Sequence, residues 1–335
     1  MITDFERVPT PDWTPDVLGD DYQQVRIDLG EDPDGEGQIE AVLVRHRSAE
    51  KTSQPQAALW VHGMTDYFFQ THVAEAYVAK DIAFYAIDLR KCGRAWRPGQ
   101  SAHHVTDMES YFIDLNRALE LIKAAGHREV SINAHSTGGL IVALWLDWLR
   151  QNPDQQQLPV TAAVLNSPWI DLQFSAWKKP VFHVVSAIMA KVRPSGLLPA
   201  GVNTGYGESI SAAHFGEWDI DLKMKPIEGH PKKWAWFNAV LKGQRQIARG
   251  IEMGVPTLVL HSDRSMLTNA YHPDLHRADA VLDVEQIAQR TPKLGAQARA
   301  QEIPGALHDV YLSHTTARAA ALAATFTFLD SVASS

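Results

Sequence analysis

A serine set between small residues is the part of this sequence best suited to chemistry. Ser136 lies in the string Ala-His-Ser-Thr-Gly-Gly at 134–139, after an apolar run at 130–134 and before another at 140–149. The first run is typical of a buried strand and the second of a helix. A serine at such a tight strand-to-helix turn presents its hydroxyl to a substrate. We therefore interpret Ser136 as a nucleophile; the alternative is an ordinary serine at the start of a helix.

A serine hydroxyl needs a nearby base, and the base needs a third group that orients it. When the serine occupies a strand-to-helix turn, an acid and then a histidine follow it along the chain. His308 lies on a loop after a short strand-like run at 298–303 and a Pro-Gly pair at 304–305. Such a loop can fold back over Ser136. We expect His308 to be the base.

The acid that orients His308 has two main candidates. Asp263 comes directly after the strand-like run at 257–261, where that strand would deliver it. Asp279 lies further on and is followed by apolar residues and by Asp283, which we expect to begin a helix as its N-cap. We favour Asp279, partly on the resemblance described below. Asp263 is the alternative acid, and Asp283 is a third choice.

Two backbone amides are expected to stabilise negative charge in the transition state, because such donors are often the largest single contribution to catalysis. Thr137, directly after the serine, supplies the first amide. Met64, which follows the strand-like run at 57–61 and a His-Gly pair, supplies the second. Gly63 lets the backbone turn there, and His62 is expected to brace the loop.

Together these strings resemble the α/β-hydrolase superfamily. Within it they are similar to the monoacylglycerol lipase and lysophospholipase group, which shares a family with the serine aminopeptidases of the S33 type. The stretches that carry the resemblance are 61–64, 86–94, 134–139 and 303–309. The resemblance implies that Ser136 is the nucleophile, that His308 is the base and that the acid is an aspartate within 263–283.

The sequence departs from this family's usual pattern at several positions. Lys91 stands where the family usually has glycine, Ala95 where it usually has serine, and Ala134 replaces the first glycine of the serine turn. The segment between Asp263 and Asp279 has the appearance of an insertion that moves the acid away from its strand. Ser265 falls about where the family's aspartate would fall without that insertion.

Strand-like and helix-like patterns alternate along most of the chain. This alternation predicts an α/β fold with a mostly parallel central sheet flanked by helices. The expected strands are 22–29, 39–46, 57–61, 82–89, 130–134, 161–166, 257–261 and 298–303. The alternation stops after Trp169 and resumes near residue 250. We therefore expect residues 1–170 and 251–335 to form the hydrolase core, with residues 171–250 as a cap inserted after the sixth strand.

The expected cap is rich in aromatic residues. These are Trp169, Trp177, Trp218, Trp234, Trp236, Phe174, Phe182, Phe215 and Phe237. They could form the small core of the cap, or an apolar roof over the serine that accepts an acyl chain. We expect Trp169 and Trp177, together with His62 and His135, to contact the substrate.

Composition limits the class of protein. The chain has 335 residues and a net charge of −8, which disfavours nucleic acid and anionic membrane surfaces as partners. Its single cysteine, Cys92, excludes an internal disulfide. The acidic N-terminal residues lack the apolar core of a secretion signal, and no run reaches the ~20 apolar residues of a membrane span. The sequence therefore predicts a cytoplasmic protein without membrane insertion; it does not predict the oligomeric state.

Neither a cofactor nor a metal is expected. Glycine-rich nucleotide motifs are absent from the sequence. His272 and His276 have the spacing of a zinc-binding helix, but Pro273 replaces the glutamate that such a helix needs.

The sequence thus predicts a serine hydrolase that cleaves carboxylic esters, with monoacylglycerol-like or lysophospholipid-like small molecules as substrates and an acyl-enzyme on Ser136. One alternative is a serine aminopeptidase, which would need an acidic patch for the substrate amine. The candidates for that patch are Glu208, Glu217, Asp219 and Asp221. A second alternative is a non-catalytic binding module on a hydrolase fold.

Overall fold

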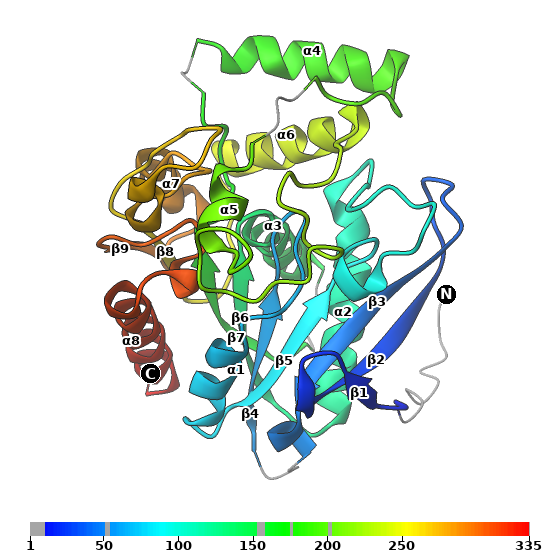
Figure 1. Ribbon diagram of the computed structural model, residues 1–335. Coiled ribbons are helices and arrows are strands. Elements are labelled where there is room, and N and C mark those ends of the chain that lie inside the picture. Colours follow the sequence, from blue (N-terminus) through cyan, green and yellow to red (C-terminus); the bar gives the residue numbers. More distant parts are fainter. Residues whose placement is uncertain (1–10, 51–53, 153–157, 175–176, 200–202, 335) are drawn as a thin grey trace.

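The computed structural model describes residues 11–50, 54–152, 158–174, 177–199 and 203–334. A nine-stranded sheet with the order β1-β2-β3-β5-β4-β6-β7-β8-β9 runs through the molecule (Figure 1). The strands are β1 (Thr14–Asp16), β2 (Gly19–Glu31), β3 (Gln38–His46), β4 (Gln56–Val61), β5 (Ala83–Asp88), β6 (Glu129–His135), β7 (Val160–Asn166), β8 (Thr257–Ser262) and β9 (Ala298–Ile303). The strands from β4 to β9 are parallel and the first three are antiparallel, which confirms the expected mostly parallel sheet.

The strands form where apolar runs predict them, because a parallel strand covered on both faces needs apolar side chains on both faces. In β4 every residue after Gln56 is buried, and in β5 every residue is buried. Strand β1 was not predicted. It contains only Thr14, Pro15 and Asp16, which carry no apolar pattern, and it forms by pairing with the edge of β2.

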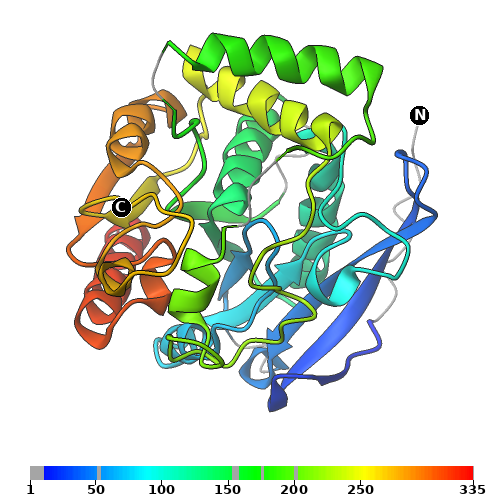
Figure 2. The same ribbon diagram turned by 45° about the horizontal axis from the view of Figure 1, so that its top comes forward.

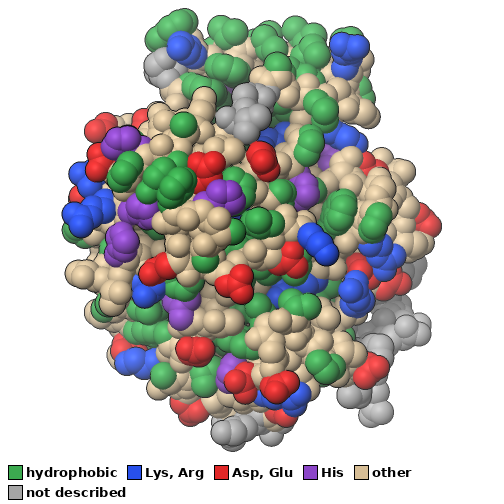
Figure 3. Space-filling view, viewed as in Figure 1, with side chains coloured by type: hydrophobic (Ala, Val, Ile, Leu, Met, Phe, Trp, Pro, Cys, Tyr) green, Lys and Arg blue, Asp and Glu red, His purple; other side chains and the backbone are tan. Residues whose placement is uncertain are grey.

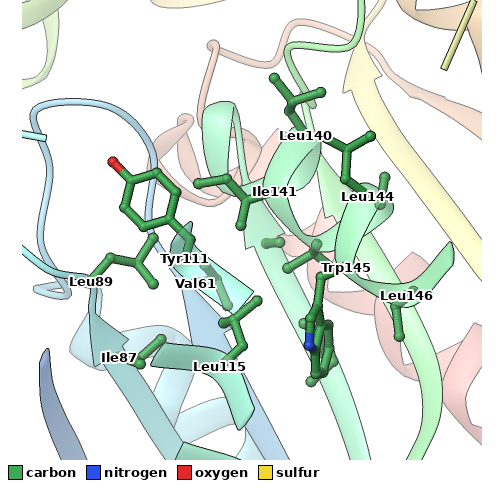
Figure 4. Close-up of a cluster of buried hydrophobic side chains, with 14 of the residues drawn as sticks. Val61, Ile87, Leu89, Tyr111, Leu115, Leu140, Ile141, Leu144, Trp145 and Leu146 are labelled. Atoms are coloured by element: carbon green, nitrogen blue, oxygen red, sulfur yellow. The ribbon is translucent and has the colours of Figure 1, made fainter. Parts of the chain in front are cut away.

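Alternating side chains of the sheet pack into two hydrophobic clusters. On one face, Leu59 and Val61 of β4 contact the cluster that contains α2 (Phe112–Ala124) and α3 (Thr137–Gln151). Figure 4 shows part of this cluster. On the other face, Trp60 contacts the cluster that contains α1 (Thr71–Val78) and α8 (Thr315–Ala333). The sheet is therefore held between two helical layers.

Three helices lie between β7 and β8. They are α4 (Lys179–Val192), α5 (Gly205–Ile210) and α6 (Trp234–Arg249). Helix α4 packs on α6, and both lie beyond the carboxyl ends of the parallel strands (Figures 1 and 2). Helix α6 also belongs to the same hydrophobic cluster as α3. The division of the chain into a core and a cap at residues 171 and 250 stays a prediction.

The remaining helices are short. They are α7 (Val284–Arg290) and the 3₁₀ helices η1 (Arg47–Glu50), η2 (Gly93–Ala95), η3 (Met108–Tyr111), η5 (Pro273–Arg277), η6 (Thr291–Leu294) and η7 (Val310–Leu312). None of the helices in the described ranges has the length and apolar character needed to cross a bilayer. Helix α4 nevertheless exposes apolar side chains on its outer face, at the top of Figure 3; Val181, Val184, Ile188 and Val192 are each more than half exposed.

Candidate active site

Ser136 occupies the sharp turn between β6 and α3. Its φ of 52° lies in the left-handed region, which costs energy for a residue with a side chain. The turn brings α3 so close to the end of β4 that a Cβ atom at Gly138 would collide with the carbonyl oxygen of His62. Ala134, which replaces the usual glycine, is fully buried, so its extra methyl group is accommodated in the core.

The structure brings Ser136, His308 and Asp279 together. The Ser136 Oγ lies 3.0 Å from His308 Nε2, and His308 Nδ1 lies 2.9 Å from Asp279 Oδ2. All three side chains are buried. Asp279 accepts the Nδ1 hydrogen, which leaves Nε2 free to accept the hydrogen of the serine hydroxyl. The arrangement has the geometry needed to remove that proton during an attack.

Backbone hydrogen bonds hold Asp279 in place. Its Oδ1 accepts hydrogen bonds from the amides of Val281 and Leu282, both at 2.8 Å. The Asp279 amide and carbonyl also form bridge hydrogen bonds with the strand-like segment around Ser265, at 2.9 Å and 2.8 Å. The residues between Asp263 and Asp279 therefore loop out and bring Asp279 back to a position beside Ser265.

The other two candidate acids have structural contacts of a different kind. Asp263 is exposed, and its Oδ1 accepts a hydrogen bond of 2.8 Å from the amide of Gly305, in the turn before His308. Asp283 is the N-cap of α7 and accepts hydrogen bonds from the amides of Glu285 and Gln286. In the part of the chain that the structure describes, neither forms a hydrogen bond or ion pair with His308.

Two free amides face the space next to Ser136. Thr137 is the first residue of α3, and Gly63, just before Met64, packs so closely that a Cβ atom there would lie 3.1 Å from the Ser136 Cβ. Within the described part of the chain, the amides of Met64 and Thr137 donate to no other group. This leaves both available to a substrate oxygen.

His62 holds the loop that carries Met64. Its Nδ1 donates to the Gly63 carbonyl at 2.7 Å, and its Nε2 accepts from the Leu89 amide at 3.0 Å. The side chain is buried and does not line the cavity described below. Both of its ring nitrogens are used within the protein, as a residue that braces the loop requires, and contact of His62 with a substrate stays a prediction.

A main cavity of about 620 Å³ opens over Ser136 and His308. Its aromatic lining residues include Trp169, Phe174, Phe182, Tyr206, Trp234, Trp236 and Phe237. His135 also lines it, and burial followed by the nearby His308 lowers the pKa of His135, so its ring is neutral. An apolar cavity of this size above a buried hydroxyl suits a small organic substrate.

Trp177 does not line this cavity. Its side chain is 74% exposed, just before α4, and its expected contact with substrate stays a prediction. Phe215 is also exposed, where it stacks on Tyr271, and Trp218 donates from Nε1 to the Leu312 carbonyl. Only some of the aromatic residues expected in the cap therefore line the main cavity.

Three charged lining residues, Lys225, Glu228 and Lys232, were missed by the sequence analysis. Lys225 forms a partly buried ion pair of 2.6 Å with Asp66, which also lines the main cavity. Only the lysine-rich composition of residues 223–233 hinted at them, and it resembles that of many surface loops. The acidic residues expected for an aminopeptidase lie elsewhere: Glu208, Glu217, Asp219 and Asp221 do not line the cavity.

The two histidines with the spacing of a zinc-binding helix belong to no group of metal ligands in the described residues. In the described ranges, no three His, Cys, Asp or Glu side chains are grouped closely enough to hold an ion. His276 contacts the Tyr271 hydroxyl at 3.1 Å, and His272 lies at the start of η5 with an exposed side chain.

Ser136 has a strained backbone and lies at the carboxyl end of a central parallel strand. Its hydroxyl is hydrogen-bonded to an imidazole, which is hydrogen-bonded to a carboxylate. This arrangement is that of an α/β-hydrolase. The family model described as serine aminopeptidase, S33, matches residues 53–312, and the chain belongs to this family. No curated protein sequence matched the chain.

Several solved structures share the fold. A soluble variant of monoglyceride lipase from Saccharomyces cerevisiae is 15% identical, with a TM-score of 0.61 over 97% of each chain. The monoacylglycerol lipase of Paleococcus ferrophilus is 15% identical, with a TM-score of 0.60 over 92% of this chain and 99% of that one. Est1E from Butyrivibrio proteoclasticus, solved with ferulic acid, is 16% identical, with a TM-score of 0.54 over 88% and 96%. These similarities establish the fold.

Proposed function

We propose that the protein is a serine hydrolase that cleaves carboxylic esters with an apolar acyl chain, such as monoacylglycerol-like or lysophospholipid-like molecules. The observation that carries the proposal is the pair of contacts at His308, which lies 3.0 Å from the Ser136 hydroxyl and 2.9 Å from the Asp279 carboxylate. A base that is hydrogen-bonded on both sides in this way activates a serine.

The first half of the reaction forms an acyl-enzyme. The Ser136 Oγ attacks the ester carbonyl carbon while His308 Nε2 takes the hydroxyl proton. The carbonyl oxygen becomes negative and accepts hydrogen bonds from the Met64 and Thr137 amides. The C–O bond to the leaving alcohol then breaks, and His308 gives its proton to the departing oxygen.

The second half releases the acid. Water replaces the alcohol, and its oxygen attacks the acyl carbon while His308 removes a proton from it. The bond between the acyl carbon and the Ser136 Oγ then breaks, and His308 returns the proton to Oγ, which regenerates the hydroxyl. The carboxylate of Asp279 stabilises the charged imidazole in both halves. The aromatic side chains that line the main cavity give the acyl chain an apolar environment.

One observation favours an ester over a peptide with a free amino terminus. An aminopeptidase needs a buried, unpaired carboxylate to bind the substrate amine. The buried carboxylate that lines the main cavity, Asp66, is paired with Lys225, and the other lining carboxylate, Glu228, is exposed. A comparison of an aminoacyl-naphthylamide with a short-chain ester separates the two activities. Faster cleavage of the naphthylamide would contradict the proposal.

The first prediction concerns the nucleophile. Ser136→Ala is expected to lower kcat for a p-nitrophenyl ester by at least ~10³-fold, because the covalent step is lost while binding remains. Ser331→Ala, on the exposed end of α8, is the matched control and is expected to keep wild-type kcat. Thermal unfolding of both variants checks that they are folded. Ester turnover by folded Ser136→Ala at more than a tenth of the wild-type rate would remove Ser136 from the mechanism.

A further inference from the structure

Lys232 is a cation in the main cavity without a partner of opposite charge. Three neighbouring lysines are paired: Lys225 with Asp66 at 2.6 Å, Lys233 with Glu36 at 2.7 Å and Lys91 with Asp32 at 2.7 Å. Lys232 forms no ion pair with any carboxylate in the described ranges, and its Nζ donates only to the His230 carbonyl, at 3.2 Å.

The ammonium group of Lys232 lies on the side of the cavity formed by the loop after β4. A Cβ atom added at Gly229 would lie 3.5 Å from the Lys232 Nζ and 3.7 Å from the Thr65 Oγ1. The His230 amide also donates to the Thr65 Oγ1, at 3.3 Å. Thr65 directly follows Met64, whose amide faces the reacting carbonyl. The cation is therefore near the loop that carries Met64 and Thr65.

His103 adds a second unused polar group. Its side chain is buried, and neither ring nitrogen has a hydrogen-bond partner among the described residues. Its ring lies 4.8 Å from that of Trp236 and 6.5 Å from that of His230. Buried polar groups without partners are rare and costly, so a ligand that bonds to them gains binding energy.

A small side hollow of about 80 Å³ lies next to the main cavity. His103 and His230 line the hollow, Lys232 lines the main cavity, and both spaces are lined by Thr65 and Asp66. Burial, followed by the Lys232 charge, lowers the pKa of His103. The ring is therefore neutral and offers one N–H donor.

The carboxylates near this hollow do not cancel the Lys232 charge. Asp66 is bound to Lys225, and Glu228 is exposed to solvent at the cavity edge. The main cavity also has aromatic lining residues, among them Phe174, Phe182 and Phe237. The cavity thus offers apolar groups to the acyl chain and a cationic group to another part of the substrate.

We propose that Lys232 and His103 bind a negatively charged oxygen group, a carboxylate or a phosphate, on the leaving alcohol of the ester. This inference rests on the proposed ester hydrolysis and narrows its substrate class. An anionic oxygen would accept hydrogen bonds from the Lys232 ammonium and the His103 N–H, and bonds of this kind are stronger than those between neutral groups. Lys232 is in this account a specificity-determining residue.

The test compares esters that differ only in charge. The first pair is 1-lauroylglycerol 3-phosphate and neutral 1-lauroylglycerol, and the second is O-lauroylglycolate and neutral O-lauroylglycolamide. We expect the wild-type ratio of kcat/KM, charged over neutral, to exceed one for at least one pair. Whichever pair shows the higher ratio identifies phosphate or carboxylate as the preferred group.

Variants of Lys232 locate the charge. Lys232→Met is expected to lower the charged-over-neutral ratio about 10- to 100-fold, because a charge-assisted hydrogen bond is lost. Lys232→Arg keeps the charge and is expected to retain most of the ratio. Lys242→Met, at an exposed lysine on α6, is the matched control and should leave the ratio unchanged. A wild-type ratio at or below one for both pairs, or an equal ratio in wild type and Lys232→Met, would overturn the inference.

A binding measurement separates this inference from the proposed function. Glycerol 3-phosphate and glycolate are titrated calorimetrically into wild type and into folded Lys232→Met. Weaker binding of either anion by the variant supports the subsite, even if no ester is cleaved and the proposed hydrolysis fails. Equal binding by both proteins, or none by wild type, contradicts the subsite, even if neutral esters are cleaved.

Discussion

At the scale of single residues, the site joins side chains that are far apart in the chain. Ser136 and His308 are separated by 172 positions, and His308 and Asp279 by 29. Ser136 and His308 could be singled out from the sequence because each follows a strand-like run at a recognisable turn. The choice between Asp263 and Asp279 could not be made from spacing alone. The segment between them separates Asp279 from β8 by more residues than a usual strand-to-acid connection.

The contacts of the two candidate acids lead to a prediction. Asp279→Ala is expected to lower kcat for a p-nitrophenyl ester by ~10³–10⁴-fold, because the imidazole loses the group that orients it and stabilises its charge. Asp263→Ala is the matched control. It removes only a hydrogen bond to the turn at Gly305 and is expected to change kcat by less than about tenfold. A larger loss in Asp263→Ala than in Asp279→Ala would show that the acid is assigned wrongly.

At the scale of elements, a buried ion network ties three segments together. Lys91, which stands where the family usually has glycine, has a φ of 58°, in the region that favours glycine. Its buried Nζ binds Asp32 at 2.7 Å and Glu36 at 3.4 Å, in the loop between β2 and β3. Glu36 also binds Lys233, directly before α6, at 2.7 Å. These contacts offset the cost of the left-handed lysine.

This network predicts a pH dependence of stability. Burial disfavours a charged Glu36, but hydrogen bonds from Lys233 and Ser101 outweigh that effect and lower its pKa from 4.5 to about 2. A lowered pKa stabilises the fold above pH ~4.5, and this contribution is lost as the pH falls toward ~2. Denaturant unfolding from pH 7 to pH 2.5 should therefore show a smaller loss of stability in Glu36→Gln than in wild type. Parallel pH profiles for the two proteins would contradict this assignment.

The order of elements could be predicted from the sequence better than the faces they expose. Apolar runs located the main strands because those strands are covered on both sides. Helix α4 has apolar residues around most of its circumference. Phe182 faces the cavity while Val181 and Val184 face outward, so periodicity alone could not show which side lines the site. The orientation of Trp177 and the lysines around the cavity depend on tertiary packing that no local pattern encodes.

At the scale of the whole molecule, the parallel sheet explains why the site forms. Ser136 follows β6, Met64 follows β4, Asp279 follows β8 and His308 follows β9. The carboxyl ends of parallel strands meet at one edge, so these residues converge there. Helices α4 and α6 lie beyond that edge and contribute aromatic side chains to the cavity over the serine (Figure 1).

The most direct measurement of the central claim is covalent labelling with an alkyl fluorophosphonate, read by intact mass and peptide mapping. The reagent bonds to an activated serine oxygen and releases fluoride. We predict one adduct per chain, on Ser136, with labelling slowed by orders of magnitude in a folded His308→Ala variant. An adduct on another residue, an unlabelled folded wild type, or unchanged labelling in His308→Ala would contradict activation of Ser136 by His308.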